Sequence, residues 1–490
     1  MKNQVQLITY VDRLTGGGIK DLKHLLDGPL AGAFGGAHLL PFFHPIDGVD
    51  AGFDPIDHTQ VDPRLGSWSD LQSLGSTVEL MADLIVNHVS SSSPQFQDFS
   101  RNGLKSTYSG MFLTFDRVFP AGATEADLLR IYRPRPGLPF TYSILANGEK
   151  RLLWTTFTPQ QIDIDVNHPQ GTAYLNAILE RFHQAGVRAI RMDAVGYAIK
   201  KPGTSCFMIP ETFAFIDDLT QRAHLLGIEV LVEVHSYYKQ QVDIARRVDW
   251  VYDFALPPLV LHALLKADAK PLVHWLSIRP KNAITVLDTH DGIGVIDVGA
   301  DAGGDPGLLE PTELNDLVES IHRLSNGQSR KATGAAANNL DLYQINCTYL
   351  DALGNNETLY LIARAMQFFV PGIPQVYYVG LLGGRNDMEL LERSGVGRDI
   401  NRHSNTMAEA VSSLDRPMVQ RLLELIRLRN SHPAFNGTCS VESVAQNLLS
   451  ISWKLDSHWI ALSVDLAQPS ANIEYSTDQA DQIAKVQIES

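Results

Sequence analysis

Three acidic residues stand where apolar, strand-like runs of this chain end. Asp193 closes AIRMD, Glu233 closes VLVE and Asp291 follows VLDTH, at separations of 40 and 58 residues. One such carboxylate is weak evidence, because turns and helix caps use aspartate freely. Several at one site suit glycoside cleavage, in which a retaining enzyme needs an ionised nucleophile and a protonated acid about 5–5.5 Å apart. We therefore treat all three as candidate catalytic residues.

Basic side chains accompany these acids. Arg191 lies two residues before Asp193, on the same side of a strand, and we expect it to keep Asp193 ionised. Glu233 ends an otherwise apolar strand, where desolvation would raise its pKa towards that of a general acid. Simpler interpretations remain open: a structural ion pair for Asp193, a buried paired glutamate, or a metal pair of Asp291 with His290. No third ligand stands at helical or hairpin spacing, so we expect no metal.

The elements that must position these residues alternate along the first 380 residues. Eight short runs rich in Val, Ile and Leu cover residues 5–10, 37–43, 80–88, 187–197, 228–235, 250–258, 283–291 and 373–380. Amphipathic segments lie between them, such as the stripe Leu175, Ile178, Leu179 and Phe182. Strands without clean alternation indicate a parallel sheet covered on both faces. The fold class is predicted as α/β, a (β/α)8 barrel whose strand ends meet at one mouth.

The barrel is interrupted by long insertions and followed by a different pattern. We expect barrel segments at 1–88, 166–291 and 357–435, an inserted domain at 89–165 and an inserted loop region at 292–356. Short alternating strands in SISWKLDSHWIALSV predict a small C-terminal β domain at 436–490. Both insertions leave from strand C-termini, where barrel loops build active sites.

Composition limits the classes of partner. The net charge of −15 over 490 residues argues against a nucleic-acid or anionic-membrane surface. Three scattered cysteines form neither a disulfide framework nor a zinc spacing. The first residues, MKNQVQLITY, lack the apolar stretch of a signal peptide, and we see no run of about 18 apolar residues. We expect a cytoplasmic protein without nucleic-acid or membrane partners.

Four dispersed regions carry a family resemblance. In DLIVNH (83–88), IRMDAVGY (190–197), EVLVEVH (229–235) and VLDTHD (286–291) the chain resembles the α-amylase superfamily, glycoside hydrolase family 13. The stretches 48–68, 133–140, 157–165, 340–346 and 397–403 resemble, within it, the sucrose phosphorylases. The resemblance implies a double displacement that moves glucose from sucrose to inorganic phosphate, giving α-D-glucose 1-phosphate and fructose. It implies no cofactor, and a homodimer by analogy.

The resemblance also implies site residues. Asp193 would be the nucleophile, Glu233 the general acid/base and Asp291 the transition-state stabiliser. The glucose pocket would comprise Asp50, Phe53, His88, Arg191, His290 and Arg398. The acceptor and phosphate contacts would be Tyr197, His235, Arg135, Leu340, Asp341, Tyr343 and Gln344. Because Asp341 would repel phosphate while serving fructose, we expect the 340–346 loop to move between the half-reactions.

Some assignments keep alternatives. Either Arg133 or Arg135 could be a solvated charge rather than a phosphate ligand. Many members of the superfamily bind calcium through an Asn at the place of Asn87, whereas the sucrose phosphorylases are thought to manage without it. Rival activities are a sucrose 6'-phosphate or glucosylglycerate phosphorylase, a sucrose hydrolase or a glucan-building transferase. From another class, the chain could be an inactive amylase-like binding or transporter-accessory protein, although all three carboxylates are present.

Overall fold

The structure is a computed structural model that describes residues 1–48, 50–133, 137–301, 303–334, 344–477 and 482–489. Four of the predicted site residues, Arg135, Leu340, Asp341 and Tyr343, lie outside the described residues. The predicted movement of the 340–346 loop falls largely on the same segment and stays a prediction.

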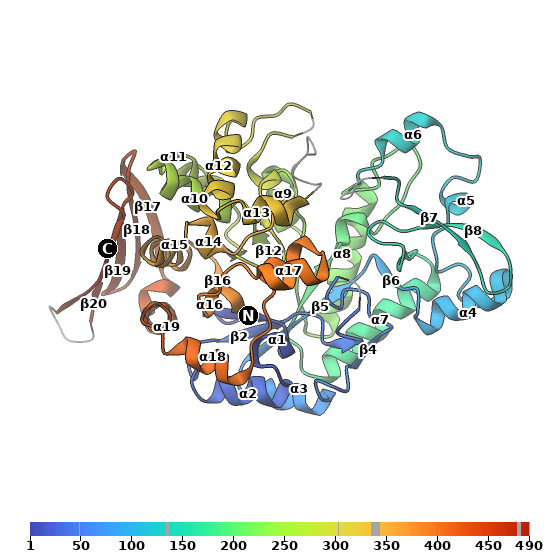
Figure 1. The fold of residues 1–490 in the computed structure, drawn as a ribbon, viewed down its shortest axis with the longest axis horizontal. Helices are drawn as coiled ribbons and strands as arrows, with labels where there is room; N and C mark the ends of the chain where they lie inside the picture. The colour runs from blue at the N-terminus through green and yellow to red at the C-terminus, as the bar shows by residue number, and fades with distance from the viewer. Residues whose placement is uncertain (49, 134–136, 302, 335–343, 478–481, 490) are drawn as a thin grey trace.

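Among the described residues, eight parallel strands close into a barrel (Figure 1). They are β1 (Gln6–Thr9), β2 (Gly36–Leu39), β5 (Glu79–Ile85), β10 (Ala189–Asp193), β11 (Glu229–Val232), β12 (Trp250–Asp253), β13 (Ala283–Thr285) and β16 (Ile373–Tyr377). Strand β1 closes the ring, because Gln6 is in register with Gly36 of β2 and with Gln375 of β16. Each strand overlaps one of the eight predicted runs, so the predicted fold class is confirmed.

The interior of the barrel contains a hydrogen-bonded polar layer beneath the mouth. His38 Nε2 lies 3.2 Å from Asp83 Oδ2, and Arg191 Nη1 donates to Asp83 Oδ1 at 2.6 Å. Tyr252 Oη donates to Gln375 Oε1 at 3.2 Å. Buried polar groups are tolerated when they are paired in this way, and the layer fixes Arg191 from below.

Helices form the outer ring of the barrel. They include α2 (Ile19–Asp27), α7 (Pro169–Gln184), α8 (Pro210–Leu225), α10 (Leu256–Lys266) and α15 (Glu357–Phe369). Helix α7 begins with Pro169 in its first turn, where a missing N–H costs nothing. The predicted stripe of Leu175, Ile178, Leu179 and Phe182 is buried on this helix. None of the helices within the described ranges is long and apolar enough to cross a bilayer.

Two segments extend from the mouth. After β5 come β6 (His88–Ser90), α4 (Pro94–Asn102), the hairpin β7 (Phe140–Ile144) with β8 (Lys150–Trp154), and β9 (Gln161–Asp163), which pairs back onto β6. This segment forms the right-hand side of Figure 1. After β13 come α12 (Pro311–Leu324) and α13 (Gln328–Thr333). The predicted domain boundaries stay a prediction.

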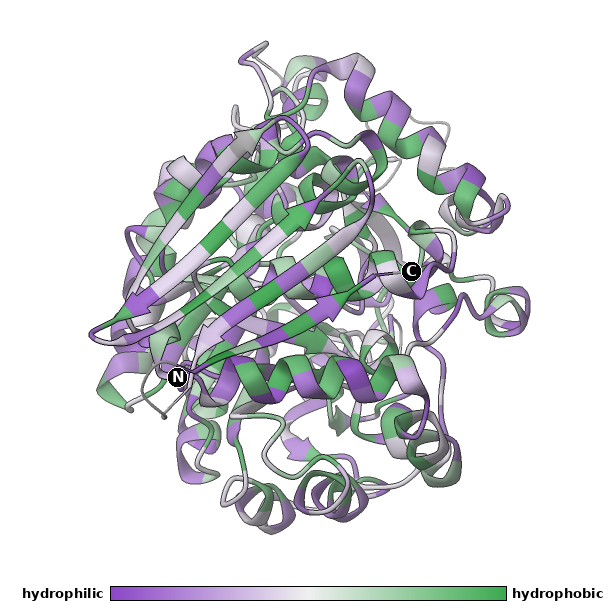
Figure 2. Cartoon of the chain, turned by 90° about the vertical axis from the view of Figure 1, so that its left-hand side faces the viewer, coloured by the Kyte–Doolittle hydropathy of each residue, from purple (hydrophilic) through white to green (hydrophobic). Residues whose placement is uncertain are grey.

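The C-terminal residues form an antiparallel sheet. Its strands are β17 (Thr438–Ala445), β18 (Leu448–Leu455), β19 (His458–Asp465), β20 (Ser470–Ser476) and β21 (Ile483–Ile488), paired in chain order. Along β18 the side chains of Leu449, Ile451 and Trp453 are buried in alternation, the pattern visible along the strands in Figure 2. Trp453 Nε1 donates to the Phe369 carbonyl of α15 at 2.7 Å, which joins the sheet to the barrel.

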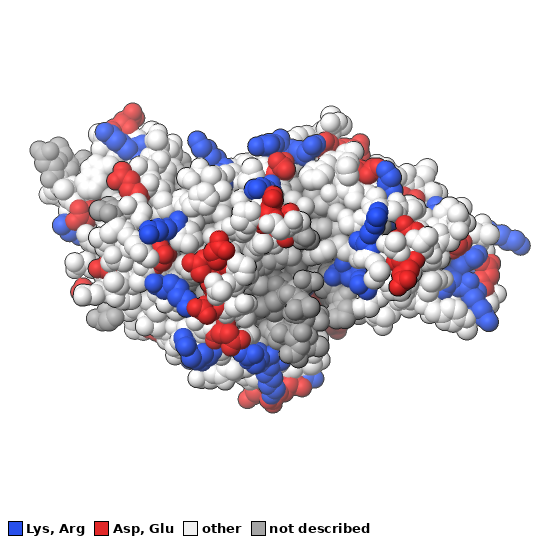
Figure 3. Space-filling model, turned by 90° about the horizontal axis from the view of Figure 1, so that it is seen from above, with Lys and Arg blue, Asp and Glu red and all other residues white. Residues whose placement is uncertain are grey.

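Charged side chains are distributed without a dominant sign on the face of the molecule seen in Figure 3. Lysines and arginines alternate there with aspartates and glutamates over the described residues. The exposed pairs include Lys331 with Glu392 and Arg330 with Glu319, both at 2.6 Å. Such a surface differs from the broad basic field of a nucleic-acid binder.

Candidate active site

A pocket of about 90 Å³ lies at the carboxyl ends of the barrel strands. Its lining contains ten of the predicted site residues: Asp50, Phe53, His88, Asp193, Tyr197, Glu233, His290, Asp291, Gln344 and Arg398. Phe157, Gln161 and Ala194 complete it and were not predicted. The lining residues come from positions between 50 and 398 of the chain, as expected where strand ends of a barrel converge.

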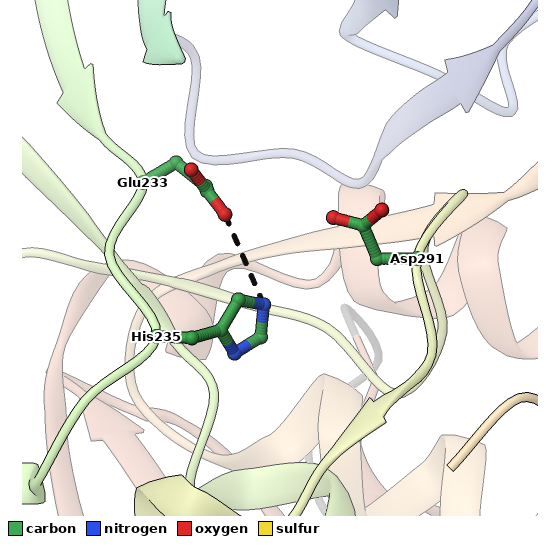
Figure 4. Close-up of side chains that lie close together, drawn as sticks. All are labelled: Glu233, His235 and Asp291. Atoms are coloured by element: carbon green, nitrogen blue, oxygen red, sulfur yellow. Dashed lines mark ion pairs between the residues drawn. The ribbon is translucent and has the colours of Figure 1, made fainter. Parts of the chain in front are cut away.

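The three candidate carboxylates share this pocket. Asp193 is the last residue of β10, Glu233 directly follows β11, and Asp291 lies in the loop after β13. Arg191 joins two of them, with Nη1 2.9 Å from Asp193 Oδ1 and Nη2 3.8 Å from Glu233 Oε1. Glu233, His235 and Asp291 each have an atom within 4.8 Å of the others, and their side chains face one space in Figure 4.

The backbone around two of the acids is strained. Ala194, directly after Asp193, has φ of 54°, and Asp50 and Ala51 have φ of 54° and 56°. Left-handed conformations cost non-glycine residues of the order of 1–3 kcal/mol and cluster where a side chain must be aimed at a ligand. The chain therefore turns sharply at the residues that present Asp193 and Asp50 to the pocket.

The pKa of Asp193 is raised well above its ordinary value. Burial is the main cause; the carboxylates of Glu233, Asp83 and Asp291 add to it, and the guanidinium of Arg191 opposes it. The expectation that Arg191 would keep Asp193 ionised considered only the ion pair. Burial and three neighbouring acids outweigh that one cation, so the pKa of Asp193 lies above its ordinary value in spite of the ion pair.

The pKa of Asp291 is shifted in the opposite direction. Burial raises its pKa, but the guanidinium of Arg398 and the neighbouring His290, Arg191 and Arg402 outweigh burial, so the pKa lies far below its usual range. Arg398 Nη1 is 2.9 Å from Asp291 Oδ1. These cations therefore favour the ionised form of Asp291.

Two arginines meet Asp50 at one end of the pocket. Arg398 Nη1 lies 3.4 Å from Asp50 Oδ2, and Arg402 Nη1 lies 3.4 Å from Asp50 Oδ1. Arg402 is fully buried and its Nε donates to the His290 carbonyl at 2.9 Å. Of these two arginines, only Arg398 was predicted from the sequence. Arg402 was missed although it stands in the same GRDINRH stretch, since nothing in the sequence says that both arginines turn inward.

Aromatic rings form the walls of the pocket. Phe53 stacks on His290 at 5.0 Å between ring centroids and an angle of 7°. Burial lowers the pKa of His290 to about 3, so this ring is a neutral donor and acceptor. His88 Nε2 lies 2.8 Å from the Phe53 carbonyl. Phe157 meets both His88 and Tyr197 edge to face, at 5.4 and 5.2 Å. A pyranose ring with apolar faces and polar edges suits such walls.

Of the predicted acceptor residues Leu340, Asp341, Tyr343 and Gln344, the described ranges include Gln344. It begins β15 (Gln344–Ile345), which pairs with β14 (Ile293–Gly294). Its Oε1 accepts from the Gly292 amide at 3.3 Å and from Arg398 Nη2 at 3.5 Å. The second insertion is thereby attached to the loop that holds Asp291.

Cationic side chains lie at the two places where metal ligands could be considered, near Asn87 and near Asp291. Lys200 Nζ lies 2.7 Å from Asn87 Oδ1 and 2.7 Å from Asp163 Oδ2, and also bonds the Tyr197 carbonyl. A buried ammonium thus takes the oxygen donors near Asn87. At the cluster of Glu233, His235 and Asp291, two guanidinium groups contact the same carboxylates. A divalent ion there would face these charges, so the donors present do not fit a metal.

Comparison with known proteins identifies the family of this chain. Residues 33–224 match the α-amylase catalytic domain. The chain is 63% identical to a sucrose phosphorylase from Agrobacterium vitis, covering 97% of this chain and 98% of the relative. It is 52% identical to a sucrose phosphorylase from Bifidobacterium adolescentis, covering 98% and 97%. The chain belongs to the sucrose phosphorylase family.

A solved structure extends the likeness to three dimensions. The crystal structure of a sucrose 6F-phosphate phosphorylase from Thermoanaerobacter thermosaccharolyticum matches with a TM-score of 0.91 and 38% identity, covering 99% of this chain and 98% of that one. At this TM-score and coverage the two chains have the same overall fold from end to end. The predicted resemblance is confirmed.

Proposed function

We propose that this protein is a sucrose phosphorylase, which transfers glucose from sucrose to inorganic phosphate and releases fructose and α-D-glucose 1-phosphate. The observation that carries the proposal is the shared pocket of Asp193, Glu233 and Asp291, with Asp50 and two arginines at one end. The identity of 63% and 52% to sucrose phosphorylases supports the choice of substrate.

The first half-reaction forms a covalent intermediate. A carboxylate oxygen of Asp193 attacks the anomeric carbon while the bond from that carbon to the fructosyl oxygen breaks. Glu233 gives its proton to the departing oxygen, so fructose leaves neutral and Glu233 becomes a carboxylate. Asp291 stays ionised throughout and stabilises the positive charge that develops on the sugar ring.

The positions of the arginines support this division of roles. The guanidinium of Arg398 outweighs burial and holds the pKa of Asp291 far below its usual range, which suits a residue that stays anionic. Arg191 lies closer to Asp193, at 2.9 Å, than to Glu233, at 3.8 Å. When the glycosidic oxygen of sucrose arrives as an acceptor, Glu233 carries the proton and Asp193 is the anion beside Arg191.

The second half-reaction uses phosphate. An unprotonated oxygen of hydrogen phosphate attacks the anomeric carbon from the side that fructose left, and the bond to Asp193 breaks with its electron pair returning to the carboxylate. The proton of the phosphate passes to Glu233, which restores the acid. Two inversions give net retention and hence the α-anomer.

The end of the pocket limits the donor to one glucosyl unit. Asp50 between Arg398 and Arg402 closes the space beyond the sugar, and its carboxylate can accept from two adjacent hydroxyl groups. A longer glucan would need an open cleft at this point. The predicted cytoplasmic location and homodimer rest on composition and on analogy, and we keep both as proposals.

Product analysis tests the proposal. The purified protein is incubated with sucrose and phosphate, and glucose 1-phosphate, fructose and glucose are measured, with sucrose 6'-phosphate in a parallel reaction. We expect equal amounts of fructose and glucose 1-phosphate from sucrose. Asp193→Asn should abolish them, whereas Asp218→Asn on the exposed side of α8 should not. Release of glucose without glucose 1-phosphate, or turnover of sucrose 6'-phosphate alone, would contradict the proposal.

A further inference from the structure

His235 is held at the mouth from several sides. Its Nδ1 lies 2.9 Å from Asp297 Oδ2, and its Nε2 lies 3.9 Å from Glu233 Oε1, the contact drawn in Figure 4. The imidazole stacks on Phe254 at 3.7 Å between centroids with an angle of 16°. The ring is buried, so its orientation is fixed by these contacts rather than by solvent.

Asp297 holds the segment that carries this ring. It lies in the short helix η3 (Ile296–Val298) after β14, fully buried, and is not among the described residues that line the pocket. Its Oδ1 accepts from the Ser236 amide at 3.2 Å and from Gln241 Nε2 at 2.9 Å. Both carboxylate oxygens are thus committed to the segment that carries His235.

The backbone is shaped to allow this contact. A Cβ placed on Gly294 would lie 2.2 Å from Asp297 Oδ2 and 3.0 Å from His235 Nδ1. Any larger residue at this position would push the carboxylate off the imidazole. Gly294 therefore lets the loop after β13 approach the end of β11 closely enough to form the pair.

The pair favours a positive charge beside the acids. An aspartate that accepts from Nδ1–H fixes the tautomer and favours the imidazolium. The charged groups facing His235 are Asp297 on η3, Glu233 on its own strand end and Asp291 on the loop after β13, whereas Phe254 and Gln241 are uncharged. Burial lowers the pKa of His235, but these three acids outweigh burial and raise it.

We propose that Asp297 is a positioning residue for the phosphate half-reaction, because its Oδ2, 2.9 Å from His235 Nδ1, fixes the imidazole beside Glu233. The inference rests on the proposed function. Phosphate is a dianion and must enter a mouth that contains Glu233 and Asp291 in a chain of net charge −15. Water and sugar acceptors are neutral and do not need a fixed cation. Asp297 would therefore favour an anionic over a neutral acceptor.

The test is the partition of the glucosyl-enzyme between phosphate and water. With sucrose as donor, initial rates of glucose 1-phosphate and glucose formation are measured over a range of phosphate concentrations. We expect Asp297→Asn to lower kcat/KM for phosphate at least about tenfold, as for loss of one charge-assisted hydrogen bond. The rate of hydrolysis in the absence of phosphate should change less than about threefold.

A second variant and a matched control complete the experiment. His235→Gln should give the same shift in partition, and the double variant should show no further loss, because the two residues act as one unit. Asp249→Asn removes the carboxylate from a His–Asp pair elsewhere, with His224 at 2.7 Å, and should leave the partition unchanged. Equal losses of phosphorolysis and hydrolysis in Asp297→Asn, or an unaltered partition, would overturn the inference.

A pH profile covers the case in which Asp297→Asn does not fold. In the wild type the ratio of phosphorolysis to hydrolysis should fall as the pH rises through the pKa of His235. This decrease should be absent in His235→Gln. The same decrease with pH in both proteins would overturn the inference. A wild type that forms no glucose 1-phosphate from sucrose would instead refute the proposed function, so the two failures are distinct.

Discussion

At the scale of single residues, the site separates its carboxylates by their surroundings. Asp291 has Arg398 at 2.9 Å and a pKa far below its usual range, whereas burial raises the pKa of Asp193. The same type of side chain is therefore tuned differently at the two positions. A carboxylate held as an anion suits a stabiliser of a cationic transition state.

Replacement of Glu233 by Gln tests the acid. We expect kcat on sucrose to fall by about 10²–10⁴, because the fructosyl oxygen then departs without a proton. Glucosyl fluoride has a good leaving group, so its first step should be largely preserved. Initial rates on both donors measure the difference, with Glu211→Gln on the surface of α8 as the control. Equal losses on both donors would remove Glu233 from the role of acid.

Replacement of Asp193 by Asn should inactivate the enzyme and stabilise its fold. Because folding raises the pKa of Asp193, its ionisation costs stability in full above the folded-state pKa, and this cost declines as the pH falls below that value and disappears below the unfolded-state pKa of about 4. The variant should gain on the order of 1 kcal/mol in unfolding free energy at neutral pH, and nothing below about pH 4. Denaturant unfolding at both pH values measures this. A destabilised variant at neutral pH would contradict it.

At the scale of elements, Lys200 ties three segments together. Its ammonium bonds Asn87 at the end of β5, Asp163 in β9 and the carbonyl of Tyr197 after β10. These segments also present His88 and Tyr197 to the pocket. The first insertion is thus fixed to the barrel by a buried charge next to the sugar site.

Replacement of Lys200 by Met removes that charge and leaves Asp163 buried without its ion pair. We expect a loss of about 3–5 kcal/mol in unfolding free energy, together with a higher KM for sucrose. Lys201→Met is the matched control, because Lys201 is exposed and pairs with Glu211 on the surface. Denaturant unfolding of both variants measures the difference in unfolding free energy. Equal stability of the two variants would show that the buried ammonium is dispensable.

The sequence predicted the elements better than their contacts. The eight barrel strands and the α7 stripe could be predicted, because periodicity reports burial along one segment. The convergence of Asp193, Glu233 and Asp291 followed from barrel geometry. Arg402, Phe157 and Lys200 could not be placed, since their roles depend on loops that meet only in the folded chain. The raised pKa of Asp193 was missed for the same reason, as it sums charges from four segments.

At the scale of the whole molecule, the C-terminal sheet and the barrel form one hydrophobic core. Trp453 is buried between them, packs against Phe435 at 5.8 Å and donates to the Phe369 carbonyl. The sheet therefore lies beside α15 of the outer helix ring (Figure 1). Its contribution should be to stability rather than to catalysis.

Replacement of Trp453 by Ala should lower the unfolding free energy by about 3–5 kcal/mol, because it removes a large buried side chain and a hydrogen bond. The kcat of the folded variant should stay within about twofold. Trp459→Ala is the control, since Trp459 is only half-buried on the next strand. Thermal unfolding and steady-state rates measure both effects. A loss of kcat without a loss of stability would assign the sheet a part in the reaction.

Closure of the barrel also governs the order of events during synthesis. Strand β1 must pair with β16, which ends at Tyr377, so the first strand keeps an open edge while more than 360 further residues leave the ribosome. At about 5–20 residues per second this interval lasts roughly 20–75 s. During that time the nascent chain exposes an apolar strand edge to its neighbours. The protein should therefore depend on chaperones for its yield, and fragments that stop before β16 should aggregate.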